Sequence, residues 1–525
     1  MTLHKRDRRE IPPDTFQLGQ KLLDAHNPYR LIGDRLGDLI SDDDYADLYA
    51  PIGGPAISPA LLALVTVFQM VEKLPDRQAA EALKMRIDWK YALHLPLDYA
   101  GFSFTNLSHF RQRLIQHQAQ YRLFDRLLEL LVELGYVRRR GQQRTDSTYV
   151  LGLVAQLSRL ELVWETLRVA LDAVEKRDAA WIERNIPEVF VQRYGVKRSD
   201  YNLTKRQAAQ ELSQAGADGF WLLAQLEQAP QAIRALSAVQ TLKTVWEQQF
   251  EQDENGHYQG PRKKVDAHGL IQSPHDPEVR YRKKRGQPWK GFSAQVSETA
   301  EDKGEVNFIT DAGLTDAQTD DSTSLPAIQD RLEGRGLLPS QQIVDQNYIS
   351  GQRLAESEEK GVELVGPVVP QPGPPGFKLD DFQVDLEQGQ ATCPAGKPSL
   401  SMQVREEAGR SRRYVFAFGQ QCLRCRFYGV CTQAKHGRTL QYDEYHPYIQ
   451  HRRMEMETET FRQTMQRRPP IEGTLSQLVR QGIRRARYRG VCRVDLQLIF
   501  TALGANLKRL CQVWARGKQP SWASP

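Results

Sequence analysis

The chain has few cysteines and no long apolar run, and each shortage excludes a class of protein. Six cysteines among 525 residues are too few for a disulfide-stapled scaffold. The longest apolar run, at 60–68, is far shorter than the roughly 20 residues that span a bilayer. The basic segment 1–16 is followed by no apolar stretch, so it does not resemble a secretory signal. We therefore expect a cytoplasmic protein with no membrane association.

Acidic residues are scarce in two parts of the chain. Residues 471–525 contain ten Lys and Arg against two acids, and residues 261–290 contain nine basic residues against three acidic ones. The whole chain has a net charge of +6, so the remainder is net acidic. Runs of charge are usually solvated faces, but aromatic residues such as Tyr281, Trp289 and Tyr488 accompany these two. The combination favours contacts with a nucleic-acid backbone.

The length and composition predict a soluble globular chain of two to four domains, because 40% of the residues are hydrophobic and 26% are charged. Changes in residue composition and in the predicted secondary structure divide the chain into four parts. Residues 1–137 are helical in pattern, and 138–365 are mixed, with a helical insertion at about 155–252. Residues 366–445 combine a proline-rich linker with a cysteine-bearing insertion, and 446–525 are basic and helical.

Three helices are predicted in the N-terminal part. Ser58 and Pro59 are typical of a helix start and open an apolar helix. A second helix is expected at 76–93, and a single apolar stripe predicts one long helix at 105–134. Such a bundle serves either as a purely structural domain or as a helix-turn-helix module that docks on DNA. The pattern does not separate these two alternatives.

Strand patterns follow the bundle and alternate with helices. The segment RTDSTYV predicts a strand that carries Asp146, and segments 289–299 and 305–310 predict an antiparallel pair. A helix from about 325, a Gly/Pro break and a short buried strand ending in Asp345 form a βα unit. These features predict a mixed α/β domain.

Glu472 is an isolated acid at the head of a strongly basic helix. It is either a helix-start carboxylate favoured by the helix dipole or a ligand that holds a divalent cation beside a polyanion. Two aspartates at strand ends, Asp146 and Asp345, would complete a set of carboxylates for hard cations. Two such ions about 4 Å apart support phosphoryl transfer. The surrounding arginines are Arg480, Arg484, Arg485, Arg487 and Arg489.

These motifs together resemble bacterial insertion-sequence transposases of the DDE type. The resemblance rests on the helical region 31–114, RTDSTYV, SPHDPEVRYRKK followed by WKGF, IVDQNYIS, and EGTLSQLVRQGIRRARYRG. It implies an α/β ribonuclease-H-like catalytic core with helical and cysteine-bearing insertions, split between 138–365 and 446–525. An all-α N-terminal domain for DNA binding and assembly would precede it. It also implies that Asp146, Asp345 and Glu472 bind Mg²⁺ or Mn²⁺.

Related cut-and-paste enzymes carry a Tyr-x2-Arg-x3-Glu-x6-Lys signature around the glutamate. Arg468 matches its arginine, whereas Met465 and Val479 stand at the tyrosine and lysine positions, with Arg480 adjacent. The resemblance implies phosphate contacts by basic residues. We expect these contacts from Arg468, Arg480, Arg484, Arg485, Arg487, Arg489, Lys283 and Lys284.

Other acids compete for the same role. Asp320 and Asp321 lie in a polar stretch before the helix near 325, where we expect helix capping. Asp276 lies between Pro274 and Pro277, and we interpret it as a turn acid or a structural residue close to DNA. We therefore retain Asp146, Asp345 and Glu472 as the candidate set.

Four cysteines gather between Asp345 and Glu472, in the pattern C-x28-C-x2-C-x5-C. Cys393, Cys422, Cys425 and Cys431 are suited to a structural Zn²⁺ site that folds a small segment with little core of its own. The alternative is four ordinary thiols that share no ion.

The resemblance predicts an endonuclease that binds the terminal inverted repeats of double-stranded DNA, cuts them and transfers strands into target DNA. By analogy with the family, it would act as a homodimer on DNA, associated with the bacterial nucleoid. Two other functions stay open. One is an inactive DNA-binding regulator of the same fold, and the other is a metal-dependent nuclease that does not transfer strands.

Overall fold

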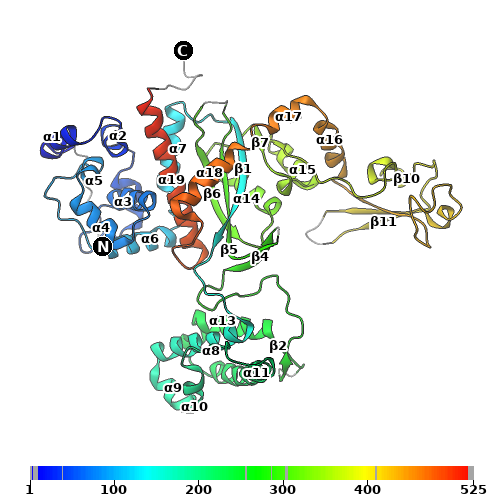
Figure 1. Cartoon of the computed structure of the whole chain (residues 1–525), viewed down its shortest axis with the longest axis horizontal. Helices are drawn as coiled ribbons and strands as arrows, with labels where there is room; N and C mark the ends of the chain where they lie inside the picture. The colour runs from blue at the N-terminus through cyan, green and yellow to red at the C-terminus, as the bar shows by residue number, and fades with distance from the viewer. Residues whose placement is uncertain are drawn as a thin grey trace.

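A mixed β-sheet forms the centre of the computed structural model, which describes residues 3, 10–37, 39–254, 257–284, 286–301, 305–407 and 411–517. Three groups of elements extend from the centre in different directions (Figure 1). They are the N-terminal helices, a helical insertion and a small β-rich segment. Among the helices described, none combines the length and the apolar composition needed to cross a membrane.

The N-terminal helices begin much as the sequence predicts but break more often. The Ser58 hydroxyl accepts a hydrogen bond from the Leu61 amide at 3.2 Å, which confirms the predicted cap. The prediction of a single helix at 105–134 is wrong. The chain forms two helices there, because Gln118 takes a left-handed φ of 54° and the chain turns at that residue. The helix expected at 76–93 is also divided, at the extended residue Arg86. The elements are α1 (Pro13–Leu22), α2 (Pro28–Arg35), η1 (Asp42–Leu48), α3 (Pro59–Glu72), α4 (Asp76–Met85), α5 (Ile87–Ala92), α6 (Thr105–Gln116) and α7 (Arg122–Glu133).

The central sheet combines an antiparallel meander with two parallel strands. Its order is β6-β5-β1-β7-β8, and β4 also pairs with β5. Neighbours on the β6 side of β1 are antiparallel, whereas β1, β7 and β8 run parallel. The antiparallel pair is confirmed, although its second strand begins at Ile309 rather than 305. The strands are β1 (Gln142–Leu151), β4 (Arg280–Lys284), β5 (Gln287–Thr299), β6 (Ile309–Asp316), β7 (Gln341–Ile343) and β8 (Glu363–Val365).

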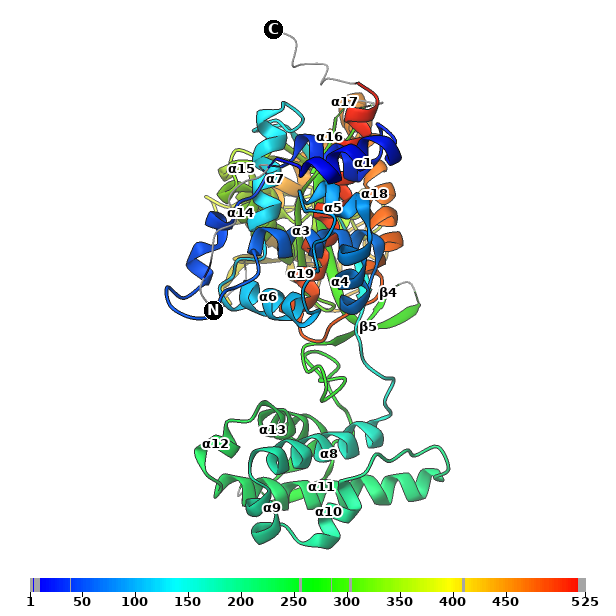
Figure 2. The same ribbon diagram turned by 90° about the vertical axis from the view of Figure 1, so that its left-hand side faces the viewer.

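The helical insertion follows β1 and has a core of its own. Trp246 is fully buried there, and its indole N–H donates to the Gly216 carbonyl at 3.0 Å. The insertion lies below the sheet in both views (Figure 2). Its elements are α8 (Arg159–Arg177), α9 (Ala179–Asn185), α10 (Glu188–Tyr194), α11 (Lys205–Glu227), α12 (Gln231–Arg234), α13 (Ser237–Gln249), β2 (Phe250–Gln252) and β3 (Tyr258–Pro261).

The β-rich segment, which we call the cysteine module (the described residues of 377–443), lies after β8. The proline-rich residues 366–376 that lead into it form neither helix nor strand. The module contains a two-stranded and a three-stranded sheet. Its elements are η3 (Leu379–Asp381), β9 (Gln383–Asp385), β10 (Gln390–Thr392), β11 (Ser401–Arg405), β12 (Arg413–Ala417), η4 (Gly419–Cys422) and β13 (Thr439–Asp443).

The remaining helices cover the sheet and join it to the N-terminal helices. Helix α19 lies between α3 and β6, so one continuous apolar core runs from the N-terminal helices into the sheet. Gly504 permits this approach, because an added Cβ would lie 2.4 Å from the Val71 side chain. These elements are α14 (Asp321–Gly334), η2 (Gln346–Tyr348), α15 (Gly351–Glu359), α16 (His446–Met456), α17 (Glu459–Met465), α18 (Pro470–Leu478), the π-helical turn η5 (Val479–Ile483) and α19 (Val491–Ala515).

The helical insertion and the cysteine module enlarge the molecule without disturbing the sheet. Each has an apolar core separate from that of the sheet, and the core of the cysteine module is much the smaller. The N-terminal helices, by contrast, share the core of the sheet through α19. A disturbance in the N-terminal helices would therefore reach the helices that cover the sheet.

A buried carboxylate joins the sheet to the last two α-helices. Glu298 on β5 is fully buried, and Arg144 on β1 and Arg509 on α19 donate to it at 2.8 and 3.1 Å. The hydroxyl of Thr474 on α18 donates to the same carboxylate at 2.5 Å. Arg144 also donates to the Arg467 carbonyl, just before α18, at 2.7 Å. Two cations around one anion thus fix β1, β5, α18 and α19 together.

We expect Glu298→Gln to destabilise the protein by about 3 to 5 kcal/mol, because it leaves Arg144 and Arg509 buried without a counter-charge. The measurement is the midpoint of urea unfolding. Glu333→Gln, at an exposed position on α14, is the matched control and should shift the midpoint little. Equal midpoints for the two variants would contradict the role of Glu298.

Candidate active site

Asp146 and Asp345 lie beside each other because of the register of β1 and β7. These strands run parallel, and Arg144 pairs with Ile343. Asp146 lies two residues after Arg144, and Asp345 lies two residues after Ile343. The predicted strand before Asp345 is present but ends at Ile343, two residues before the aspartate, and Asp146 lies within β1 rather than at its end. The reason is that β1 continues to pair with β5 as far as Leu151 after its pairing with β7 has stopped.

Glu472 reaches the same place from α18, which packs against β1. Arg468, one turn earlier, links the three acids. Its Nη2 atom lies 2.8 Å from Asp146 Oδ2 and 4.0 Å from Asp345 Oδ2, and its Nη1 atom lies 3.8 Å from Glu472 Oε1. Three carboxylates that are distant in sequence therefore surround one guanidinium group.

The three acids differ in exposure, and so in the cost of their negative charge. The side chain of Asp146 is 12% exposed, that of Asp345 24% and that of Glu472 69%. Burial raises the pKa of Asp146 to about 6, although Arg468 and the Ser147 amide, which donates at 2.8 Å, act to lower it. Asp345 and Asp321 add a smaller increase to the pKa. The ionised form of Asp146 is therefore disfavoured, and a further cation nearby would stabilise it.

Asn347, two residues further along the chain, holds the side chain of Asp345 in place. The Asp345 side chain caps η2, accepting from the Asn347 amide at 2.8 Å and from the Asn347 side chain at 3.1 Å. The next side chain along η2, Tyr348, is fully buried and donates to Gln295 on β5. The sequence IVDQNYIS therefore supplies both an acid and the contacts that orient it.

The capping role expected for Asp320 and Asp321 is wrong, because no side chain caps α14. Asp320 is exposed and forms an ion pair with Arg282 at 3.1 Å. Asp321 is buried within the first turn and accepts from Gln295 at 3.2 Å. Sequence reasoning weighed Asp321 as a competing acid but did not identify Gln295 as a neighbour of the site, because only the fold brings the start of α14 and the middle of β5 near Asp146.

The basic residues expected at DNA differ in their surroundings. Arg480, Arg485, Arg489 and Lys283 are exposed. Lys284 is also exposed, with its Nζ atom 4.0 Å from Asp321. Arg484 lies 3.6 Å over the ring of Tyr149 and donates to the Tyr149 carbonyl at 2.6 Å. Arg487 donates to the Leu74 carbonyl and so joins the N-terminal helices to the C-terminal segment.

Acids outside the candidate set have other partners. Asp276 is buried and accepts from the Gly490 amide at 3.1 Å, within a turn closed by its own backbone. Over the ranges that the structure describes, no group of three or more His, Cys, Asp or Glu side chains is arranged so that it could hold a metal ion. At the three carboxylates, the Arg468 guanidinium group occupies the space between them. The chemistry of the donors nevertheless suits a hard cation, because all three are carboxylates.

Two family models match the chain. The model described as "Transposase DDE domain" matches residues 392–511, which include Glu472 and much of the cysteine module. The model described as "Transposase domain (DUF772)" matches residues 17–113, from α1 into α6. These matches indicate a DDE-type insertion-sequence transposase. The transposase resemblance drawn from the sequence is thereby confirmed, although Asp146 and Asp345 lie outside both matched spans. No curated protein and no solved structure matches the chain.

The raised pKa of Asp146 predicts how the stability of this protein depends on pH. The folded state binds the proton more tightly than the unfolded state, where the pKa is near 3.8. The ionised Asp146 therefore costs stability, and the cost grows as the pH rises from about 4 to about 6. We expect Asp146→Asn to be more stable than the wild type at pH 7, by up to about 3 kcal/mol.

This gain should disappear near pH 4, and denaturation midpoints measured from pH 4 to 7 test it. Asp98→Asn, at an exposed position, is the control and should track the wild type. A loss of stability in Asp146→Asn at pH 7 would mean that the ionised carboxylate stabilises the fold, against the direction of its pKa shift.

Proposed function

We propose that this transposase cuts DNA at the terminal repeats of its element and transfers the freed 3′ ends into target DNA, with Asp146, Asp345 and Glu472 as the catalytic carboxylates. The observation that carries the proposal is the convergence of these three side chains on Arg468. They come from a central strand, the end of its parallel neighbour and a helix. A structural ion pair does not require three acids from separate elements to converge on one cation, whereas a cation site for phosphoryl transfer requires converging carboxylates.

Asp146, Asp345 and Glu472 would hold Mg²⁺ or Mn²⁺, which when bound activates the attacking oxygen and stabilises the leaving oxygen. The residues of the chain prepare this site. Burial in β1 fixes the position of Asp146, the η2 turn fixes Asp345, and the network around Glu298 fixes the start of α18. Exposure of Glu472 leaves one side of the site open to a large substrate.

Arg468 has two roles in this proposal. Without a bound cation, its guanidinium group offsets the repulsion between the three carboxylates. Its Nε atom is buried and has no hydrogen-bond partner in the described structure. When cations and DNA occupy the site, we infer that the guanidinium group turns outward to a phosphate oxygen. This role agrees with the match of Arg468 to the arginine of the family signature.

We further propose that the mixed sheet is a ribonuclease-H-like core. Its meander β1-β5-β6, followed by the parallel strands β7 and β8, supports this assignment. The helical insertion interrupts the core after β1, and the cysteine module interrupts it after β8. The N-terminal helices would bind DNA and assist assembly of a homodimer on paired ends, and Arg480, Arg485, Arg489 and Lys283 would contact phosphates near the carboxylates.

The alternative of a nuclease without strand transfer rests on the same three acids. Both functions predict metal-dependent cleavage, and only the transposase joins a cut 3′ end to a new strand. An inactive regulator would bind terminal repeats and cut nothing. The preserved convergence of the carboxylates favours an active enzyme.

The catalytic assignment predicts that Asp345→Asn lowers Mg²⁺-dependent cleavage and strand transfer by more than about a hundredfold, because a cation ligand is lost. Donor DNA carrying the terminal repeats and a supercoiled target plasmid provide both readouts on one gel. Asp320→Asn changes an exposed aspartate of the same domain and should keep near wild-type activity. Full activity of Asp345→Asn would exclude Asp345 from the catalytic set.

The DNA-contact assignment separates Arg485 from Arg487. Arg485 is exposed, so Arg485→Ala should weaken DNA binding equally for all sequences. It should also reduce the magnitude of the negative slope of log K against log salt concentration by about 0.9, which is the counterion release expected for one phosphate contact. Arg487→Ala should instead lower the unfolding midpoint and leave the slope unchanged, because its guanidinium group binds the Leu74 carbonyl. Fluorescence anisotropy at several salt concentrations measures the slopes, and equal slopes for Arg485→Ala and wild type would refute the contact.

A further inference from the structure

The cysteine module has little apolar material with which to hold itself together. Its core comprises six buried side chains and a few partly buried neighbours, among them three of the cysteines. Its strands are five residues or fewer in length. Segments this small usually need a disulfide or a metal to stay folded. The module therefore needs an additional source of stability. The six buried side chains are Phe382, Ala391, Phe416, Phe418, Leu440 and Tyr442.

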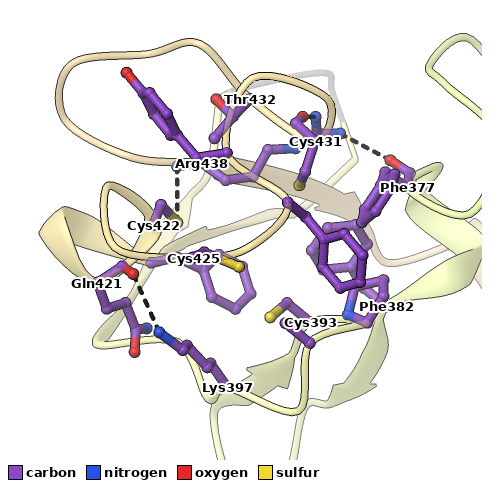
Figure 3. Close-up of a pocket in the computed structure, with 15 residues that line it drawn as sticks. Phe377, Phe382, Cys393, Lys397, Gln421, Cys422, Cys425, Cys431, Thr432 and Arg438 are labelled. Atoms are coloured by element: carbon purple, nitrogen blue, oxygen red, sulfur yellow. Dashed lines mark hydrogen bonds between the residues drawn. The ribbon is translucent and has the colours of Figure 1, made fainter.

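The fold brings four cysteines from separate turns to one small cavity. Cys393, Cys422, Cys425 and Cys431 all line a cavity of about 20 Å³, which is room for a single small occupant. Figure 3 shows the thiols of Cys393, Cys425 and Cys431 directed into the space between the turns. The fold thus brings Cys393 and Cys422 to the same cavity although 28 residues separate them in the sequence.

The backbone around the cysteines forms tight turns that present the thiols. The Cys425 amide donates to the Cys422 carbonyl at 3.0 Å, and the Gly396 amide donates to the Cys393 carbonyl at 2.7 Å. The Arg438 amide donates to the Cys422 sulfur at 3.4 Å. A backbone N–H directed at a sulfur atom stabilises the thiolate form, which is the form that binds metal.

Two cations border the same cavity. Lys397 and Arg438 line it, and they are anchored by bonds to the Gln421 and Cys431 carbonyls at 3.2 and 2.5 Å. Four thiolates around one Zn²⁺ carry a net charge of −2, which these two side chains would balance. Such charge balance is not needed by four neutral thiols.

We propose that Cys393, Cys422, Cys425 and Cys431 bind one structural zinc ion, and that this ion holds the cysteine module folded. Each thiol releases its proton to solvent as it binds. The four sulfurs do not stand at ligand spacing in this structure, since the described residues contain no ready-made metal group. The turns must therefore draw together around the ion until each sulfur lies about 2.3 Å from it.

The zinc ion would also steady the path of the chain between the catalytic acids. Asp380 in the module accepts from His446 at 2.6 Å and also binds Arg453, and both partners belong to α16. Helix α16 leads through α17 to α18, which carries Glu472. The proposal thus goes beyond the catalytic assignment, and it stands or falls separately from it.

The test is the zinc content of the full-length protein, purified under reducing conditions without chelators and measured by inductively coupled plasma mass spectrometry. We expect about one zinc per wild-type chain, and about a tenth or less of that in Cys425→Ser and Cys393→Ser. Cys492→Ser, which changes the exposed cysteine of α19, should keep the ion. Asp146→Asn should keep it too, which distinguishes this site from the carboxylates. A wild-type chain without zinc, or Cys425→Ser with full zinc, would overturn the proposal.

A second measurement covers the case in which the cysteine variants do not fold. Wild-type protein is loaded with Co²⁺ in place of zinc, and its absorption spectrum is recorded. Four thiolates around cobalt give strong sulfur-to-metal charge-transfer bands and intense visible bands typical of a tetrahedral site. Weak visible bands without charge transfer would mean oxygen ligands and would reject the cysteine site.

Discussion

The fully buried carboxylate of Glu298 is the interaction on which the arrangement of this protein depends. It receives hydrogen bonds from Arg144, Arg509 and Thr474, which belong to β1, α19 and α18. A buried charge must be paired wherever it lies, so none of these elements can shift without leaving a charge exposed to an apolar interior. The strand of Asp146 and the helix of Glu472 are therefore locked to each other by a contact that includes neither acid.

The candidate site shows the opposite balance, with three acids and one cation. Burial raises the pKa of Asp146 to about 6 even beside Arg468, so the ionised form of Asp146 is disfavoured in this site. Such an arrangement lowers stability in exchange for affinity toward an added cation. The network around Glu298 offsets this cost by fixing β1 and α18, the elements that carry Asp146 and Glu472.

Local patterns were informative where a residue acts through its nearest neighbours. Ser58 and Pro59 start α3 as expected, and RTDSTYV forms β1, because capping and strand alternation depend on adjacent residues. The apolar stripe at 105–134 predicted one helix where there are two, because the spacing of apolar residues continues across the turn at Gln118. Likewise Asp321 sits at a helix start, where capping is the usual role, but its side chain is buried toward Gln295 instead.

The sequence by itself determined the chemical types available: three well-separated acids, two basic segments, four clustered cysteines and the motifs of a transposase. Only the tertiary structure decided how these side chains are used. The register of β1 and β7 places Asp146 beside Asp345, and α18 brings Arg468 between the acids. The fold also assigns Arg487 to an internal contact while Arg485 stays exposed. The physical reason is that burial and charge pairing depend on contacts between residues hundreds of positions apart, which local patterns do not contain.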